Sequence, residues 1–157
     1  MIVSSLLVLA AALPAAFAGE KELPVPRFVS LRAEEANLRT GPGVRYPVEW
    51  VFVRRNMPVE IVDEHETWRR IRDAEGTTGW VHQSMLSGKR SFLVTAERTT
   101  IRRSPSPDAA VVAVAESGVV GALSECQGQW CRVEAQGLKG WLARADIWGA
   151  YPGEVVK

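Results

Sequence analysis

The sequence predicts an all-β protein: two tandem small β-barrels after an N-terminal signal peptide. Three observations support this prediction. Short apolar runs alternate with turn-forming residues, no apolar stripe keeps a helical spacing, and a set of segments recurs in order about 60 positions later. The chain has 157 residues, of which 46% are hydrophobic and 24% are charged, and these are globular proportions.

The charge balance excludes several classes of function. Nineteen Lys and Arg against eighteen Asp and Glu give a net charge of +1, without the basic excess of a nucleic-acid-binding protein. The glycine-rich motifs GxGxxG and GxxxxGK[ST] of nucleotide-binding loops are absent from the sequence. We therefore expect a small binding or structural protein with no nucleic-acid partner and no cofactor.

The N-terminal segment is typical of a secretory signal. Residues 1–18 carry no charged side chain and end in Ala16-Phe17-Ala18, which predicts cleavage before Gly19. An uncleaved anchor is disfavoured because Pro14 interrupts a run of about 17 residues, whereas a membrane span needs about 20. We expect the mature chain to be periplasmic or extracellular without stable membrane insertion, and residues 19–26 to form an N-terminal linker.

The first copy is predicted to start its strands after this linker. Strands are expected near residues 28–33, 49–54, 59–64, 68–72 and 78–81, where apolar runs stand between turn formers. The turns are Gly41-Pro42-Gly43, Asn56-Met57-Pro58 and Glu75-Gly76. Gln83-Ser84-Met85 is expected to form a single 3₁₀ turn that closes the barrel.

The second copy follows the same plan. Its strands are expected near residues 92–96, 111–115, 119–125, 131–135 and 140–142. The first barrel is assigned to residues 27–88, the linker to 89–91, and the second barrel with its C-terminal tail to 92–157. Closure of each sheet into a barrel removes the exposed strand edges that endanger a free-standing sheet.

The duplication rests on three matched segments in the same order. They are Asn37-Leu38-Arg39-Thr40-Gly41-Pro42 with Thr100-Ile101-Arg102-Arg103-Ser104-Pro105, Trp68-Arg69-Arg70-Ile71 with Trp130-Cys131-Arg132-Val133, and Gly79-Trp80-Val81 with Gly140-Trp141-Leu142. The offsets are 63, 62 and 61 residues, so the spacing drifts by one residue at each of two loops. Three ordered matches make chance similarity an inadequate explanation.

The motifs of the first copy resemble the bacterial SH3-like (SH3b) domain, and the mature chain is similar to exported proteins with tandem SH3-like domains. The residues concerned are Asn37-Leu38-Arg39-x-Gly41-Pro42-Gly43, Trp68-x-x-Ile71 and Gly79-Trp80-Val81. The resemblance implies small β-barrels that often bind peptidoglycan or envelope peptides, commonly beside a catalytic domain. The second copy departs from the pattern, with Thr100, Ser104 and Ser106 in that turn, which puts a site there in doubt.

Two cysteines, Cys126 and Cys131, are expected to form a disulfide because the chain is predicted to be exported. The intervening Gln127-Gly128-Gln129-Trp130 is predicted to be a four-residue hairpin loop. A zinc site would need two more ligands, and the only histidines, His65 and His82, are distant in sequence, so no metal is expected. A cysteine nucleophile is the remaining alternative, but no neighbouring residue marks it.

The repeat aligns Glu64 and Arg69 with the two cysteines, which predicts a cross-strand ion pair in the first copy. Strand alternation would then place charged Arg69 on the same face as the apolar Ile71. Either a β-bulge intervenes, or the pair lies at the barrel rim, where the two faces merge.

The candidate ligand-binding residues belong to the first copy. Six tryptophans cannot all be interior in so short a chain, and strand alternation turns Trp68 outward if Ile71 points inward. The candidates are Asn37, Arg39, Arg45, Tyr46, Trp68 and Trp80. Their alternatives are core or rim packing for Trp80, a hydrogen bond to the turn backbone for Asn37, and a solvated basic face for the arginines. Guanidinium groups would otherwise suit carboxylate or phosphate ligands.

Two functions remain open. The first is a non-catalytic envelope binding module, in which an aromatic groove between residues 37–46 and the Trp68 hairpin holds peptidoglycan or an extended peptide. The second is an adaptor whose apolar tail, Trp148 to Tyr151, docks on another exported protein. Catalysis is not expected because acidic residues such as Glu66 lie on an apparent hairpin, where carboxylates stay solvated.

Overall fold

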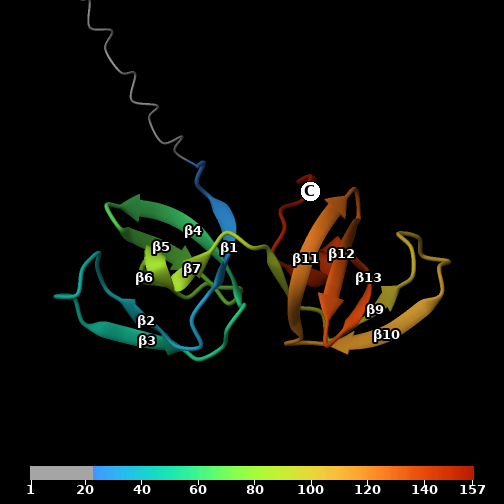
Figure 1. The fold of residues 1–157 in the computed structure, drawn as a ribbon, viewed down its shortest axis with the longest axis horizontal. Helices are drawn as coiled ribbons and strands as arrows, with labels where there is room; N and C mark the ends of the chain where they lie inside the picture. Colours follow the sequence, from blue (N-terminus) through green and yellow to red (C-terminus); the bar gives the residue numbers. More distant parts are fainter. Residues whose placement is uncertain (1–22) are drawn as a thin grey trace, which may run out of the picture.

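The computed structural model describes residues 23–157 as two lobes of β-strands side by side (Figure 1). Each lobe is a seven-stranded sheet curled on itself, and the all-β prediction is confirmed. The predicted signal peptide, residues 1–18, lies outside the described residues, and the predicted barrel and linker boundaries stay predictions. Among residues 23–157, no helix has the length and apolar character needed to cross a membrane.

The first sheet has the strand order β3-β2-β6-β5-β4-β1-β7. Its elements are β1 (Arg27–Leu31), β2 (Ala36–Arg39), β3 (Val48–Phe52), β4 (Pro58–His65), β5 (Trp68–Arg72), β6 (Thr78–His82), the 3₁₀ turn η1 (Gln83–Met85) and β7 (Leu86–Ser87). The predicted 3₁₀ turn is confirmed, and its N-cap is the His82 side chain, which accepts a hydrogen bond from the Ser84 backbone N–H.

The second sheet has the order β10-β9-β13-β12-β11-β8-β14, which is the first order with seven added to each number. Its elements are β8 (Ser91–Val94), β9 (Arg98–Arg102), β10 (Val111–Glu116), β11 (Val120–Gln127), β12 (Trp130–Ala135), β13 (Leu138–Ala143), the 3₁₀ turn η2 (Arg144–Asp146) and β14 (Ile147–Trp148). Identical topology in both halves supports the duplication inferred from sequence.

Four strands, β2, β9, β7 and β14, were not predicted from the sequence. In β2, Ala36 and Leu38 are buried while Asn37 is exposed, so the strand alternates but lasts only four residues before the Gly41 turn. The two-residue strands β7 and β14 carry no periodic signal and exist only because β1 and β8 offer them a free edge.

Each lobe encloses its own hydrophobic core. The first core contains Val29, Leu31, Ala36, Leu38, Phe52, Val59, Ile61, Ile71, Val81 and Leu86. The second contains Phe92, Val94, Ile101, Ala115, Leu123, Cys126, Cys131, Val133, Ala135, Leu142, Ile147 and Val156. Two separate cores are the expected result of a copied unit that buries its own apolar face.

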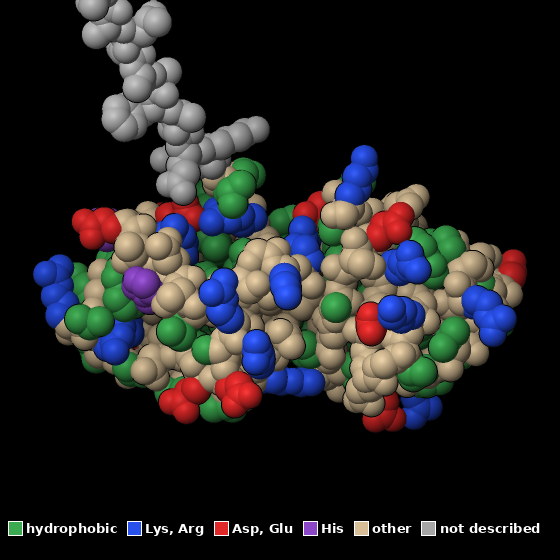
Figure 2. Space-filling view, in the orientation of Figure 1, with side chains coloured by type: hydrophobic (Ala, Val, Ile, Leu, Met, Phe, Trp, Pro, Cys, Tyr) green, Lys and Arg blue, Asp and Glu red, His purple; other side chains and the backbone are tan. Residues whose placement is uncertain are grey.

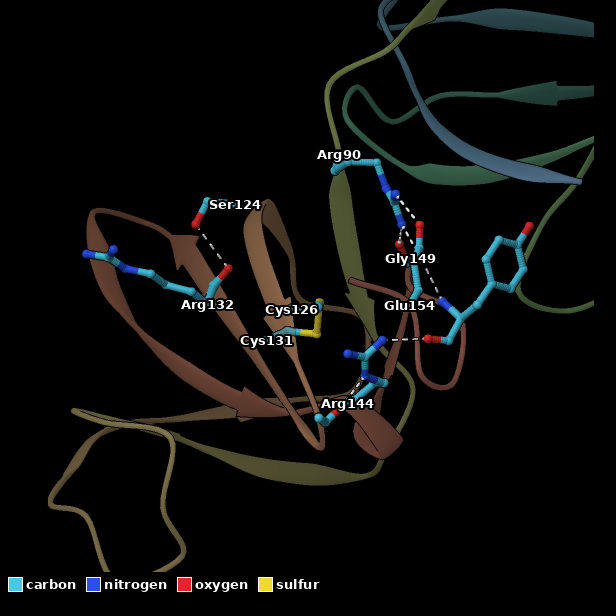
Figure 3. Close-up of a disulfide and its surroundings, with 10 residues drawn as sticks. Arg90, Ser124, Cys126, Cys131, Arg132, Arg144, Gly149 and Glu154 are labelled. Atoms are coloured by element: carbon cyan, nitrogen blue, oxygen red, sulfur yellow. Dashed lines mark hydrogen bonds and ion pairs between the residues drawn. A yellow bond between two sulfur atoms is a disulfide. The ribbon is translucent and has the colours of Figure 1, made fainter. Parts of the chain in front are cut away.

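The predicted disulfide between Cys126 and Cys131 is present and buried, with the two Cα atoms 4.1 Å apart (Figure 3). The predicted four-residue loop is wrong. Gln127 pairs with Trp130 across the hairpin, so the turn contains only Gly128 and Gln129. Gly128 has a φ of 51°, a left-handed conformation that glycine adopts without steric cost, which permits so tight a turn.

The predicted ion pair in the first lobe is also present. Glu64 and Arg69 are cross-strand partners, with Arg69 Nε 2.9 Å from Glu64 Oε1, and Arg27 Nη2 approaches the same oxygen at 2.5 Å. The strand register shifts between Ile61 and Asp63, as a β-bulge requires. A charged cluster therefore joins β1, β4 and β5 at the place where the second lobe has its disulfide.

The C-terminal tail holds the two lobes together. Trp148 and Tyr151 pack on Phe28 of β1, with ring centroids 4.9 Å and 4.5 Å away. Arg90 donates to both carboxylate oxygens of Glu154, at 2.7 and 3.0 Å, and to the Gly149 carbonyl at 2.7 Å (Figure 3). The tail surface that the adaptor hypothesis assigned to another protein is thus occupied by the first lobe, because these aromatic rings are apolar and Phe28 lies within their reach.

Candidate functional site

An open groove of about 570 Å³ lies between two segments of the first lobe. One wall is the loop after β2, and the other is the tip of the β4–β5 hairpin together with the end of β6. The lining residues are Pro42, Gly43, Val44, Arg45, His65, Glu66, Thr67, Trp68 and His82. These are the segments between which the predicted groove was placed.

Trp68 forms the centre of the hairpin wall. It pairs with His65 on β4 and with His82 on β6, so three rings come from neighbouring positions on three strands. The rings of Trp68 and His82 meet edge to face, with centroids 5.5 Å apart. His82 is fixed in turn by Ser84, whose Oγ lies 2.7 Å from His82 Nδ1. The half-buried indole of Trp68 is therefore held in place before any ligand arrives.

The loop wall is packed around Tyr46. A Cβ placed on Gly41 would lie 2.5 Å from Tyr46 Cδ1, so the phenol ring rests directly on the Gly41 backbone. The Arg45 guanidinium stands 5.1 Å from the centre of the Tyr46 ring, and its Nη2 donates to Tyr46 Oη at 3.2 Å. The Tyr46 ring thus packs against the loop backbone and beside Arg45, and Arg45 lines the groove.

Arg39 fastens this loop to the sheet. Its Nη1 donates to the carbonyl oxygens of Val44 at 3.1 Å and Tyr46 at 2.8 Å. Arg102 does the same in the second lobe, where its Nη1 donates to the Ala109 carbonyl at 2.9 Å. An arginine that makes the same backbone contact in both copies acts as a positioning residue for the loop.

The bacterial SH3 domain model matches this chain twice, over residues 32–88 and 95–149. The chain belongs to the bacterial SH3 domain family. The first SH3 domain holds the groove, and the second repeats its strand order.

A curated relative is the "Putative N-acetylmuramoyl-L-alanine amidase YrvJ" of Bacillus subtilis (strain 168), 27% identical over 128 residues. That alignment covers 69% of this chain but 24% of the relative, so the chain spans about a quarter of that protein's length.

Two solved structures are also similar to this chain, at low scores. NlpC2 from Trichomonas vaginalis gives a TM-score of 0.38 at 10% identity, covering 83% of this chain and 50% of that one. An NlpC/P60 family protein from Bacillus cereus ATCC 10987 gives 0.36 at 15% identity, covering 80% and 57%. Likenesses at this level say nothing about activity.

The structure distributes the six predicted site residues over three places. Arg45 and Trp68 line the groove, and Tyr46 lies behind its loop wall. Arg39 and Trp80 instead face a second hollow of about 370 Å³. Asn37 is exposed on β2 and lines neither hollow.

Sequence reasoning missed the two histidines of the groove. His65 and His82 were considered as zinc ligands and as partners of a cysteine nucleophile, and the zinc site was set aside because they lie far from the cysteines in sequence. Strand register carries the signal that would have found them, since both are direct neighbours of Trp68 across the sheet. Within residues 23–157, no three His, Cys, Asp or Glu side chains gather as a metal site.

The acidic side chains of the hairpin form contacts within the protein or are exposed to solvent. Glu64 is paired with two arginines, and Asp63 Oδ1 accepts the Glu64 backbone N–H at 2.8 Å. Glu66 is exposed at the groove edge. The groove therefore offers an aromatic face, imidazole nitrogens and one guanidinium, with the Glu66 carboxylate at its edge, and these groups suit binding by stacking and hydrogen bonds.

Proposed function

We propose that this chain is a non-catalytic, exported cell-envelope binding protein whose first SH3 domain recognises peptidoglycan or an extended peptide. The observation that carries the proposal is the groove in which Trp68 and His82 face the loop containing Arg45. Family membership and the printed amidase name of the curated relative support a ligand from the cell wall.

The chemistry of the groove suits such a ligand. An indole face attracts the C–H face of a sugar ring or the aliphatic part of an amino-acid side chain. The imidazole nitrogens of His65 and His82 supply hydrogen bonds, and Arg45 supplies a planar guanidinium for a free carboxylate of a stem peptide.

Export is supported by the disulfide. A bond between Cys126 and Cys131 persists in an oxidising compartment such as the periplasm or the outside of the cell, and the first 18 residues have the composition of a secretory signal.

The direct test is co-sedimentation of the purified protein with peptidoglycan sacculi. We expect the wild type to pellet with sacculi and Trp68→Ala to remain largely in the supernatant. Trp130→Ala, which truncates the equivalent residue of the second SH3 domain, is the matched control and should pellet like the wild type. Circular dichroism must show both variants folded.

Three results of this experiment bear on the proposal. A wild type that stays in the supernatant overturns wall binding. Equal losses for Trp68→Ala and Trp130→Ala would place the binding surface outside the groove. Soluble muropeptides that release the wild type from the pellet identify the peptide-bearing sugar as the ligand.

A further inference from the structure

A second concave site lies where the two SH3 domains meet, on different elements from the groove. It is a cleft of about 240 Å³ whose lining includes Ser30, Arg54, Arg55, Lys89, Arg90 and Ser91. A neighbouring hollow of about 280 Å³ shares Arg55, Asn56 and Lys89 and adds Arg32. Figure 2 shows Lys and Arg side chains gathered over the junction between the lobes.

The cleft carries positive charge that the described part of the chain does not neutralise. No carboxylate forms an ion pair with Arg32, Arg54, Arg55 or Lys89 among residues 23–157, and neither hollow is lined by Asp or Glu. Arg90 is the exception, since Glu154 holds its guanidinium. The other four cations come from the loop after β1, the β3–β4 loop and the segment between the domains. These four side chains are exposed, and their convergence on two neighbouring hollows leaves a positive potential over a concave surface.

A buried hydroxyl points to a missing partner in the same cleft. Ser91 is only 4% exposed, and its Oγ has no hydrogen-bond partner in the part of the chain that the structure describes. The hydroxyl of Ser30, which also lines the cleft, is satisfied, because its Oγ donates to the Lys89 carbonyl at 2.8 Å. A buried polar atom without a partner is costly, and a ligand that fills the cleft would supply one.

The cleft is formed in advance of binding. Arg54 Nη1 donates across the junction to the Gly118 carbonyl at 2.6 Å, and the tail rings of Trp148 and Tyr151 hold Phe28 of the first domain. These contacts fix one domain against the other, so little conformational entropy has to be lost when a ligand enters.

We propose that this interdomain cleft binds an extended anion bearing several phosphate groups. Charged donors reach it from two segments, Arg54 and Arg55 of the β3–β4 loop and Lys89 of the segment between the domains, and Ser91 lines its wall. A phosphate presents three or more acceptor oxygens in a tetrahedron, which suits donors from several directions better than the two coplanar oxygens of a carboxylate. Two joined hollows favour a chain of phosphates over a single ion, and their concavity disfavours a flat bilayer surface.

The test uses sodium tripolyphosphate as the probe, with the purified full chain in isothermal titration calorimetry. We expect saturable binding that weakens with added salt. Arg55→Ala and Lys89→Ala should each weaken binding by about tenfold, the usual loss for a charge-assisted hydrogen bond. Ser91→Ala should weaken binding while the melting temperature stays unchanged or rises, because the substitution removes an unpaired buried hydroxyl.

Matched controls separate a site from general attraction. Arg103→Ala and Arg132→Ala remove the same charge from exposed positions of the second domain that line neither hollow. They should leave the affinity for tripolyphosphate within about twofold of the wild type.

Several results would overturn the proposal. They are the absence of binding, equal losses in the control variants, and tighter binding of tri-glutamate than of tripolyphosphate. Sacculi are absent from this experiment, so its outcome does not depend on the groove of the first domain.

Discussion

The ring of Tyr46 lies on the backbone of Gly41, and a Cβ on Gly41 would come within 2.5 Å of Tyr46 Cδ1. The glycine is needed here for space, since Gly41 is not among the glycines with positive φ. In the second domain both partners differ, with Ser104 and Ala109 in the same places. The loop keeps its backbone contacts there, as Ser106 N donates to the Ser104 carbonyl at 2.8 Å. Glycine and aromatic ring thus occur together where the groove wall is built.

This pairing predicts the effect of Gly41→Ala. The added methyl overlaps the phenol ring, so the ring must move, and we expect a loss of about 1–3 kcal/mol in the free energy of unfolding. Urea denaturation measures this loss in the free energy of unfolding. The same substitution in a Tyr46→Ala background should cost much less, because the clash is gone. Equal costs in the two backgrounds would show that Tyr46 is not what excludes the methyl group.

The two arginine contacts provide an internal comparison. Arg39→Ala removes the donor to Val44 and Tyr46, and Arg102→Ala removes the donor to Ala109. We expect each to speed hydrogen exchange in its own loop by about tenfold, since one charged hydrogen-bond donor is lost. Only Arg39→Ala should also weaken retention by sacculi. A loss of retention with Arg102→Ala of the same size would contradict a site confined to the first domain.

The disulfide makes a separate prediction for stability. Loop-closure entropy for the short ring between Cys126 and Cys131 predicts that Cys126→Ala with Cys131→Ala lowers the free energy of unfolding by about 2 kcal/mol. Denaturation of the reduced wild type provides the control, because it breaks the bond and retains both side chains. A reduced wild type as stable as the oxidised protein would deny the bond a role in stability.

Tyr151 predicts a loss of stability at alkaline pH. Burial, the hydrogen bond that its hydroxyl donates to Glu60 Oε2 at 2.9 Å, and the charge of Glu60 raise the pKa of Tyr151 well above its ordinary value of 10.0. The unfolded chain therefore releases this proton first. The stabilisation that the Tyr151 hydroxyl provides is fully present below about pH 10. It is lost as the pH rises further, because ionisation then favours the unfolded state.

Tyr151→Phe tests this assignment. At neutral pH we expect it to cost about 1–2 kcal/mol, since the Glu60 carboxylate loses a donor. Above about pH 10 the difference from the wild type should shrink, as unfolding curves across this range would show. In a Tyr46→Phe protein, absorbance at 295 nm reports Tyr151 alone, and ionisation of Tyr151 near its ordinary value would contradict the buried hydrogen bond.

Local patterns in the sequence were enough for several parts of the fold. The predicted strand at 68–72 coincides with β5, and the recurrence of Trp68-Arg69-Arg70-Ile71 as Trp130-Cys131-Arg132-Val133 anticipated the shared strand order. The pairing of Glu64 with Arg69 followed from alignment with the cysteines. Each of these features depends on residues close in sequence or on an internal repeat. Local patterns and repeats can both be recognised in the amino-acid sequence.

Tertiary structure alone decided where distant residues meet. Strand register brought His65 and His82 beside Trp68, and domain packing set the tail on Phe28. The sequence by itself determined two β-units with a short cross-link in the second. The relative placement of those units, and hence the cleft around Ser91, depended on apolar and hydrogen-bond contacts between residues about 60 to 120 positions apart. Such contacts have no periodicity in the chain, because geometry rather than spacing selects the partner.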